Sequence, residues 1–289
     1  MSRNLKIWIT GANGQLGRAI LRQMKQEKEL YSVLASDMDV DITDMDAISR
    51  YARSTHPNVI INCAGMTDVS ACEENMVKAY KVNALGARNM AAAARIVDAK
   101  IIQISTDDVF AGIRKDRLTE FDMAIPNTVY GKSKLAGEEL VRELNPKHLV
   151  IRSSWMYGDG ENFLTRLLAK IDKGETVHVP FDQVSTPTSA DSLAKAIMKL
   201  SESTEYGIYH ASCLGCCSRY DFAKKILELT GKNLEQIQPI TIEELSGGIE
   251  RPKNTILENL MMEMTEIYTM PFWEDDLEKY LEVRGLKHE

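Results

Sequence analysis

The chain has 289 residues, of which 44% are hydrophobic and 27% charged, and its formal net charge at pH 7 is -7. These values predict a soluble globular protein with one large domain, or one domain plus a smaller lobe. The negative charge, with both signs interspersed, argues against a nucleic-acid partner, and no apolar run is long enough to span a membrane.

The N-terminus leads directly into a strand-like run at residues 5–9, without a signal-peptide pattern. The number of cysteines is five, an odd count that favours reduced thiols and a cytoplasmic location. Cys213 and Cys216 have C-x-x-C spacing, but no second Cys/His pair lies at a matching distance. We therefore predict no metal site at these cysteines and interpret them as chemically inert.

Strand-like and helix-like segments alternate through the first half of the chain. Strands are predicted at residues 5–9, 31–35, 59–61, 100–104 and 148–152, and helices at 16–24, 47–52, 77–97 and 130–144. Strands separated by helices pair in parallel with helices on both faces, which predicts a doubly wound, Rossmann-type α/β fold.

The alternation loosens after Arg152. Residues 250–254 form a predicted loop, and the other predicted elements are helices at 163–171, 190–200, 220–229 and 272–283 and strands at 176–179 and 207–210. We expect residues 1–151 to form the sheet domain, with 189–211 returning to it. Residues 152–188 and 212–289 would then form a smaller α+β lobe.

Ligands of such sheets bind beyond the carboxyl ends of the strands. A glycine-rich turn with G-x-x-G-x-x-G spacing follows the first predicted strand. Gly11 permits a tight exit, Gly14 lets the backbone approach a pyrophosphate, and Gly17 lets the helix pack closely. The helix N-terminus offers amide groups to phosphates. The residues expected to contact a dinucleotide here are Gly11, Asn13, Gly14, Gln15 and Leu16.

Asp37 ends the second predicted strand, about 20 residues after the glycine turn, where an acid accepts from a ribose 2′-hydroxyl. It would repel a 2′-phosphate, which favours NAD over NADP. The alternative is a solvated loop acid, because several aspartates crowd this segment. Asp41 and Ile42 could instead lie at the edge of the adenine ring.

Small residues, Cys63, Ala64 and Gly65, follow the third strand and would let a cofactor lie against the backbone. A tight turn at Gly65 is equally compatible with them. Asn83 lies within a predicted helix, where asparagine is unfavourable. It needs a reason, such as a hydrogen bond to a strand end, and structural and cofactor-binding roles both remain open.

Tyr130 and Lys134 are four residues apart at the start of a predicted helix and share one face. A nearby ammonium lowers the pKa of a phenol toward the working range, and it can also hold a nicotinamide ribose. Thr106 ends the fourth strand and would hydrogen-bond a substrate oxygen as charge develops. Together with the glycine turn, these residues predict carbonyl reduction beside a nicotinamide.

The sequence resembles the extended branch of the short-chain dehydrogenase/reductase family, and within it the dTDP-4-dehydrorhamnose reductases. The resemblance covers nearly the whole chain. The motifs that carry it are Ile9–Gly17, Asp41–Asp44, Ser105–Asp107 with Val109–Phe110, Tyr130–Glu138, Arg152–Gly158, Asp182–Gln183, Pro187–Thr188 and Arg251–Pro252.

The resemblance implies an NAD(P)-binding sheet domain, a sugar-nucleotide lobe and reduction of the C4 ketone of dTDP-4-dehydro-6-deoxy-L-mannose by NADH or NADPH. Thr106, Tyr130 and Lys134 match the catalytic positions. The residues expected near the substrate are Thr106, Asp107, Asp108, Trp155 and Asn162. Some relatives use magnesium at a homodimer interface, but the sequence does not place such a site here.

Departures from the family pattern cluster where substrate identity would be set. Asp108 replaces a tyrosine, Gly65–Met66 stands where Ala-Tyr is usual, Ser70 replaces an aspartate and Ser185 replaces a glycine. Two alternatives therefore stay open. One is a nucleotide-sugar epimerase or dehydratase, for which an acidic pair such as Asp107–Asp108 is suited. The other is a non-catalytic regulatory subunit resembling the methionine adenosyltransferase β subunits.

Overall fold

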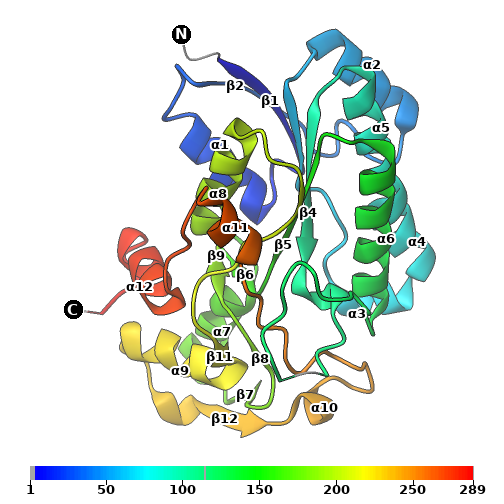
Figure 1. Cartoon of the computed structure of the whole chain (residues 1–289). Coiled ribbons are helices and arrows are strands. Elements are labelled where there is room, and N and C mark those ends of the chain that lie inside the picture. Colours follow the sequence, from blue (N-terminus) through cyan, green and yellow to red (C-terminus); the bar gives the residue numbers. More distant parts are fainter. Residues whose placement is uncertain (1–3, 114, 289) are drawn as a thin grey trace.

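The computed structural model describes residues 4–113 and 115–288, and a six-stranded parallel sheet lies at its centre (Figure 1). The strand order is β10-β5-β4-β3-β1-β2. The strands are β1 (Leu5–Thr10), β2 (Tyr31–Ala35), β3 (Val59–Asn62), β4 (Lys100–Thr106), β5 (His148–Ser153) and β10 (Gly207–His210). The doubly wound α/β fold predicted from the sequence is confirmed.

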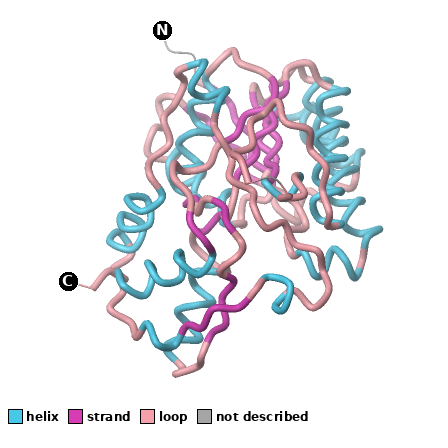
Figure 2. Tube along the Cα trace, turned by 60° about the horizontal axis from the view of Figure 1, so that its bottom comes forward, coloured by secondary structure: helices cyan, strands magenta, loops and turns pink. Residues whose placement is uncertain are grey.

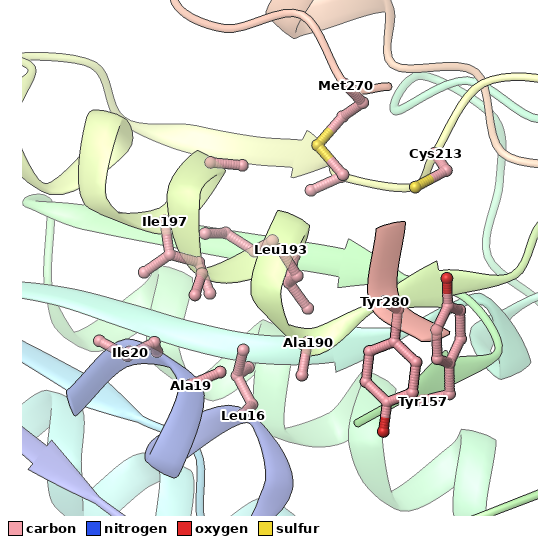
Figure 3. Packing of buried hydrophobic residues seen from close by; sticks show 14 of the residues in the cluster. Leu16, Ala19, Ile20, Tyr157, Ala190, Leu193, Ile197, Cys213, Met270 and Tyr280 are labelled. Atoms are coloured by element: carbon pink, nitrogen blue, oxygen red, sulfur yellow. The ribbon is translucent and has the colours of Figure 1, made fainter. Parts of the chain in front are cut away.

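Helices cover both faces of this sheet because alternate strand residues point to opposite sides. Ile7 and Ile9 join an apolar cluster with α1 and α8, whereas Trp8 between them packs in a second cluster with α2 and α5. Figure 3 shows side chains of the first cluster between α1 and α8. The helices are α1 (Gln15–Met24), α2 (Met45–Thr55), α5 (Ala87–Ile96), α6 (Val129–Leu144) and α8 (Ala190–Glu202).

The helix predicted at residues 77–97 is found within one residue of its predicted bounds, at residues 76–96. It is not α-helical throughout, because a π-helical turn lies in its middle, and a separate short helix precedes it. Asn83 lies in that turn and points its amide at Met66 and Ser133 rather than at solvent. The segments are α3 (Val69–Glu74), α4 (Met76–Tyr80), the π-turn η1 (Lys81–Gly86) and then α5.

The second half of the chain adds three two-stranded sheets and short helices, which Figure 2 shows apart from the central sheet. Its segment 190–210 lies on the central sheet, because α8 packs against α1 and β10 pairs with β5. The sequence did not predict β12, α10 or α11. The elements are η2 (Asp107–Val109), β6 (Met156–Tyr157), α7 (Phe163–Asp172), β7 (Val177–Pro180), β8 (Val184–Ser185), β9 (Thr188–Ser189), β11 (Cys217–Ser218), α9 (Arg219–Leu229), η3 (Leu234–Gln236), β12 (Ile237–Ile240), α10 (Ile242–Leu245), α11 (Leu260–Thr265) and α12 (Trp273–Val283).

All five cysteines are free thiols. The Cys213–Cys216 pair precedes β11, and Cys217 within that strand is buried. In the part of the chain that the structure describes, no helix combines the length and apolarity needed to cross a bilayer.

A buried ion pair joins α6 to the sheet. Arg152 on β5 lies 2.7 Å from the carboxylate of Glu138 on α6, and their side chains are only 4% and 1% exposed. The Ser105 hydroxyl on β4 donates to the same carboxylate. One acidic side chain therefore links α6 to two neighbouring strands.

Glu138→Gln should destabilise the protein by about 3–5 kcal/mol, because it leaves the Arg152 cation buried without its counter-charge. Urea unfolding of the two proteins measures this difference. The double variant Glu138→Leu/Arg152→Met should recover most of the loss, since it removes both charges together. An unfolding free energy unchanged in Glu138→Gln would contradict this account of the pair.

Candidate active site

One cavity of about 880 Å³ runs along the carboxyl ends of the central strands. Its wall combines the glycine turn, the residues after β3, the start of α6 and part of the second half of the chain. The predicted site residues that line it are Gly11, Gly14, Gln15, Leu16, Cys63, Gly65, Thr106, Tyr130, Lys134, Trp155 and Asn162. The structure therefore brings the glycine turn and the hydroxyl, phenol and lysine around a single space.

The glycine turn has the geometry of a phosphate cradle. Gly11 has φ +63°, and a Cβ there would lie 2.6 Å from the Ala64 nitrogen. A Cβ on Gly17 would lie 2.4 Å from the Gly11 oxygen, so the helix can approach only because this residue is glycine. Gly14 occupies the N-cap of α1, where no side chain caps the first turn. The first amides of α1 are thus left to a ligand.

A loop from the second half of the chain lies over this turn. The Gln15 amide donates to the Glu161 carbonyl at 2.9 Å, and Arg18 donates to the carbonyls of Asn13 and Asp159. Asn162 caps α7 and donates to the Gly158 carbonyl at 2.7 Å. The Asn162 amide therefore holds the loop, and it lies beside the glycine turn.

Other predicted cofactor residues do not line the cavity. Asp37 accepts from the Asn13 amide at 2.9 Å and so supports the turn from the end of β2. Asp41 is exposed and accepts from the Thr43 amide at 2.8 Å. Ile42 is buried, and its side chain fills the space against Gly86.

Asn83 acts through the loop that follows β3. Its side-chain oxygen accepts from the Met66 amide at 2.8 Å, and its nitrogen donates to the Met66 carbonyl at 2.9 Å and to the Ser133 hydroxyl at 2.9 Å. These bonds hold Ala64–Met66 against α6. The sequence predicted that Asn83 needs a hydrogen-bond partner. The structure supplies Met66 and Ser133 in this role.

The phenol of Tyr130 is buried and lies close to the Thr106 hydroxyl. Burial raises the pKa of the phenol above its usual value, the nearby Asp108 carboxylate raises it further, and the Thr106 hydroxyl opposes the shift. The sequence predicted that Lys134 lowers the pKa of Tyr130, and this prediction is wrong. Desolvation is the largest cause of the shift, so the phenol keeps its proton at neutral pH.

The Lys134 ammonium donates to the Ile104 carbonyl of β4 at 2.6 Å. Burial lowers its pKa to about 8, and the Glu138 carboxylate one turn further along α6 opposes that shift. The lysine is therefore mostly charged at neutral pH and held at the end of β4.

Asp107 and Asp108 do not line the cavity, but both lie next to residues that do. Asp107 accepts from the hydroxyls of Thr106 at 3.2 Å and Ser185 at 3.1 Å, and also from Thr255. Burial raises its pKa to about 7, and the charge of Asp108 adds to this shift. Asp108 lies 3.9 Å from the Arg251 guanidinium. Ser185 replaces the family glycine and supplies one of the hydroxyls on Asp107.

Arg219 and Arg251 also line the cavity. The sequence did not predict that either residue belongs to the site. The Arg219 guanidinium stacks on the Trp155 ring, 3.5 Å from its centroid. Burial lowers the pKa of Arg219 to about 9, and the neighbouring Arg251 charge adds to the effect. The one sequence signal for them was the Arg251–Pro252 motif, which belongs to the family resemblance. Trp155 has φ +38°, a strained value for a bulky residue, and one face of its ring is covered by Arg219.

Comparisons with known proteins show the family to which the chain belongs. A family model described as RmlD substrate binding domain matches residues 5–285. The crystal structure of a dTDP-4-dehydrorhamnose reductase from Clostridium acetobutylicum is 44% identical with a TM-score of 0.93, covering 97% of this chain and 100% of that one. A dTDP-4-dehydrorhamnose reductase from Bacillus anthracis, solved in complex with NADP, is 36% identical with a TM-score of 0.93 at the same coverage.

A third relative is the spore coat polysaccharide biosynthesis protein SpsK of Bacillus subtilis. It is 36% identical over 281 residues, which are 97% of this chain and 98% of that protein. The matches thus extend over the central sheet and the second half of the chain alike. The chain belongs to the RmlD substrate-binding domain family, as its resemblance to the dTDP-4-dehydrorhamnose reductases predicted.

Proposed function

We propose that this protein reduces the C4 ketone of a nucleotide sugar with NADH or NADPH, converting dTDP-4-dehydro-6-deoxy-L-mannose to dTDP-L-rhamnose. The observation that carries the proposal is the single cavity shared by the glycine turn, Thr106, Tyr130, Lys134 and a pair of arginines. The reductases among its relatives support the substrate class. We place the reaction in the cytoplasm, where reduced thiols persist.

The cofactor fits the residues present. The glycine turn and the uncapped first turn of α1 would hold its pyrophosphate, and Lys134 would hold the nicotinamide ribose. When bound, the reduced nicotinamide supplies a hydride. Asp37 supports the turn from β2, and a carboxylate there disfavours a 2′-phosphate, although a Bacillus anthracis relative is in complex with NADP. The activity assay should therefore compare NADH with NADPH.

The protonated phenol suits reduction, because the C4 oxygen needs a proton as it gains charge. Tyr130 donates that proton, and the Thr106 hydroxyl stabilises the developing charge on the same oxygen. The phenolate that results lies near the Lys134 ammonium, which favours the charged form. Burial of all three groups strengthens these interactions by excluding water.

The guanidinium groups of Arg219 and Arg251 would bind the diphosphate of the substrate. Both line the cavity, and both are close enough for their charges to repel. Arg251 has only a long contact, 3.9 Å, with the Asp108 carboxylate. Arginine pairs bind phosphates through charge-assisted hydrogen bonds, so a diphosphate would relieve this repulsion.

The alternatives differ in what they need from the acidic pair and from the cofactor. Neither Asp107 nor Asp108 lines the cavity: the first is bound by three hydroxyls and the second faces Arg251. This arrangement disfavours a dehydratase, which needs its acids at the sugar. A regulatory subunit needs no proton donor, whereas Tyr130 and Thr106 lie close together and both line the cavity.

The deciding experiment mixes the purified protein with dTDP-4-dehydro-6-deoxy-L-mannose and follows the absorbance of NADH or NADPH. The proposal expects stoichiometric loss of reduced cofactor with formation of dTDP-L-rhamnose. Bound cofactor without net consumption would instead favour an epimerase or dehydratase. Co-purification with a larger partner and no ketone reduction would favour the regulatory role.

Tyr130→Phe should lower kcat by several orders of magnitude while NADH binding persists, because the variant loses the proton donor but keeps the aromatic ring. Steady-state turnover and cofactor fluorescence titration measure the two properties separately. Turnover near that of the wild type would refute the role of Tyr130.

Raising the pH should lower kcat/KM for the reduced cofactor through an apparent pKa near 8. The pKa of Lys134 is about 8, so its ammonium deprotonates as the pH rises past that value. Tyr130 does not contribute this limb, because its pKa is raised further above neutrality. Rates between pH 6 and 9.5 test this, with Lys134→Met as the control that should lack the limb. A flat wild-type profile would remove Lys134 from the mechanism.

Arg251→Ala should raise KM for the nucleotide sugar about tenfold or more and leave KM for NADH unchanged, since a hydrogen bond to a charged group contributes about 1.5–3 kcal/mol. Lys253→Ala is the matched control. Lys253 carries the same charge two residues away, pairs with Asp182 at 3.2 Å and does not line the cavity. Equal effects of the two variants would show that only net charge matters.

A further inference from the structure

Ser153 carries a buried hydroxyl that has no hydrogen-bond partner among the residues the structure describes. Its exposed fraction is 6%. Similar hydroxyls nearby are bonded: Ser105 donates to Glu138, and Ser154 donates to the Thr186 carbonyl at 2.6 Å. Because buried polar groups in folded proteins nearly always have partners, the Ser153 hydroxyl calls for a ligand.

The position of Ser153 indicates which ligand. It is the last residue of β5 and pairs in register with Thr106, the last residue of β4. It lines the same cavity. Ile151 and Leu149, two and four residues earlier on β5, pack in the cluster with α1 and α8, so alternation places Ser153 on that face. The helix α6, which carries Tyr130 and Lys134, packs on the opposite face, where its Val141 joins the cluster with Trp8.

A dinucleotide with its pyrophosphate at Gly11–Gly14, just after β1, must cross the ends of β3 and β4 to reach β5, because that is the strand order. The proposed ribose contact, Lys134, is held at Ile104 on β4. The nicotinamide ring then comes next, at the ends of β4 and β5. Its carboxamide carries N–H donors, and a serine hydroxyl can accept from them.

We propose that the Ser153 hydroxyl binds the nicotinamide carboxamide and thereby fixes the rotation of the ring beside Thr106 and Tyr130. Ser153 is a positioning residue in this proposal, which rests on the proposed nicotinamide cofactor but not on the identity of the sugar. The other potential occupant, a hydroxyl of the sugar, is distinguished by the experiment.

Ser153→Ala in the full chain should separate binding from stability. The cofactor-free variant should melt at or above the wild-type temperature, because no protein hydrogen bond is lost. Ser154→Ala is the stability control and should melt lower, because it removes a buried bond. By fluorescence titration, the Kd for NADH should rise about fivefold or more in Ser153→Ala, while the Kd for dTDP stays unchanged.

A cofactor analogue gives a second readout. The 3-acetylpyridine dinucleotide lacks the amide N–H, so the wild type should bind NADH more tightly than the reduced analogue, and Ser153→Ala should lose that preference. An unchanged Kd for NADH, or a melting temperature lowered as in Ser154→Ala, would overturn the proposal. So would an unchanged Kd for NADH with a raised KM for the sugar. A wild type that turns over no ketone but shows the Ser153 effect would refute the reductase proposal alone.

Discussion

The packing of α6 against the ends of β4 and β5 is the constraint on which the site depends. Three polar side chains at successive turns of α6 meet the sheet. Tyr130 lies close to Thr106, Lys134 donates to the Ile104 carbonyl, and Glu138 accepts from Arg152 and Ser105. The buried ion pair at the third position fixes the rotation of the helix. The first two positions are thereby presented to the cavity.

Glycines allow this packing to be close. A Cβ on Gly131 would lie 2.1 Å from the Asp108 carbonyl oxygen, and one on Gly137 would lie 2.3 Å from the Asn83 carbonyl oxygen. The π-turn that holds Asn83 therefore faces α6 directly, and its side chain bonds to Ser133 on that helix. The loop after β3, which borders the proposed cofactor site, is positioned by the same helix as the proposed proton donor.

Burial decides the protonation states in the cavity. The phenol of Tyr130 is kept protonated by desolvation and by the acid pair, whereas the pKa of Lys134 is lowered toward neutrality. Asp108, which replaces a family tyrosine, contributes to the first effect and also faces Arg251. One departure from the family pattern thus affects both the proposed proton donor and a proposed phosphate ligand.

The sequence by itself determined the alternating strands and helices, the glycine turn, and the shared face of Tyr130 and Lys134, because these depend on local periodicity and spacing. The tertiary structure decided what those patterns could not encode. Asn83 donates to Ser133 on another helix, and Asp107 accepts from Ser185 and Thr255 in the second half of the chain. Arg219 and Arg251 lie close together although they are distant in the sequence. The direction of the Tyr130 pKa shift was also missed, because desolvation is set by the packing of elements far apart in the chain.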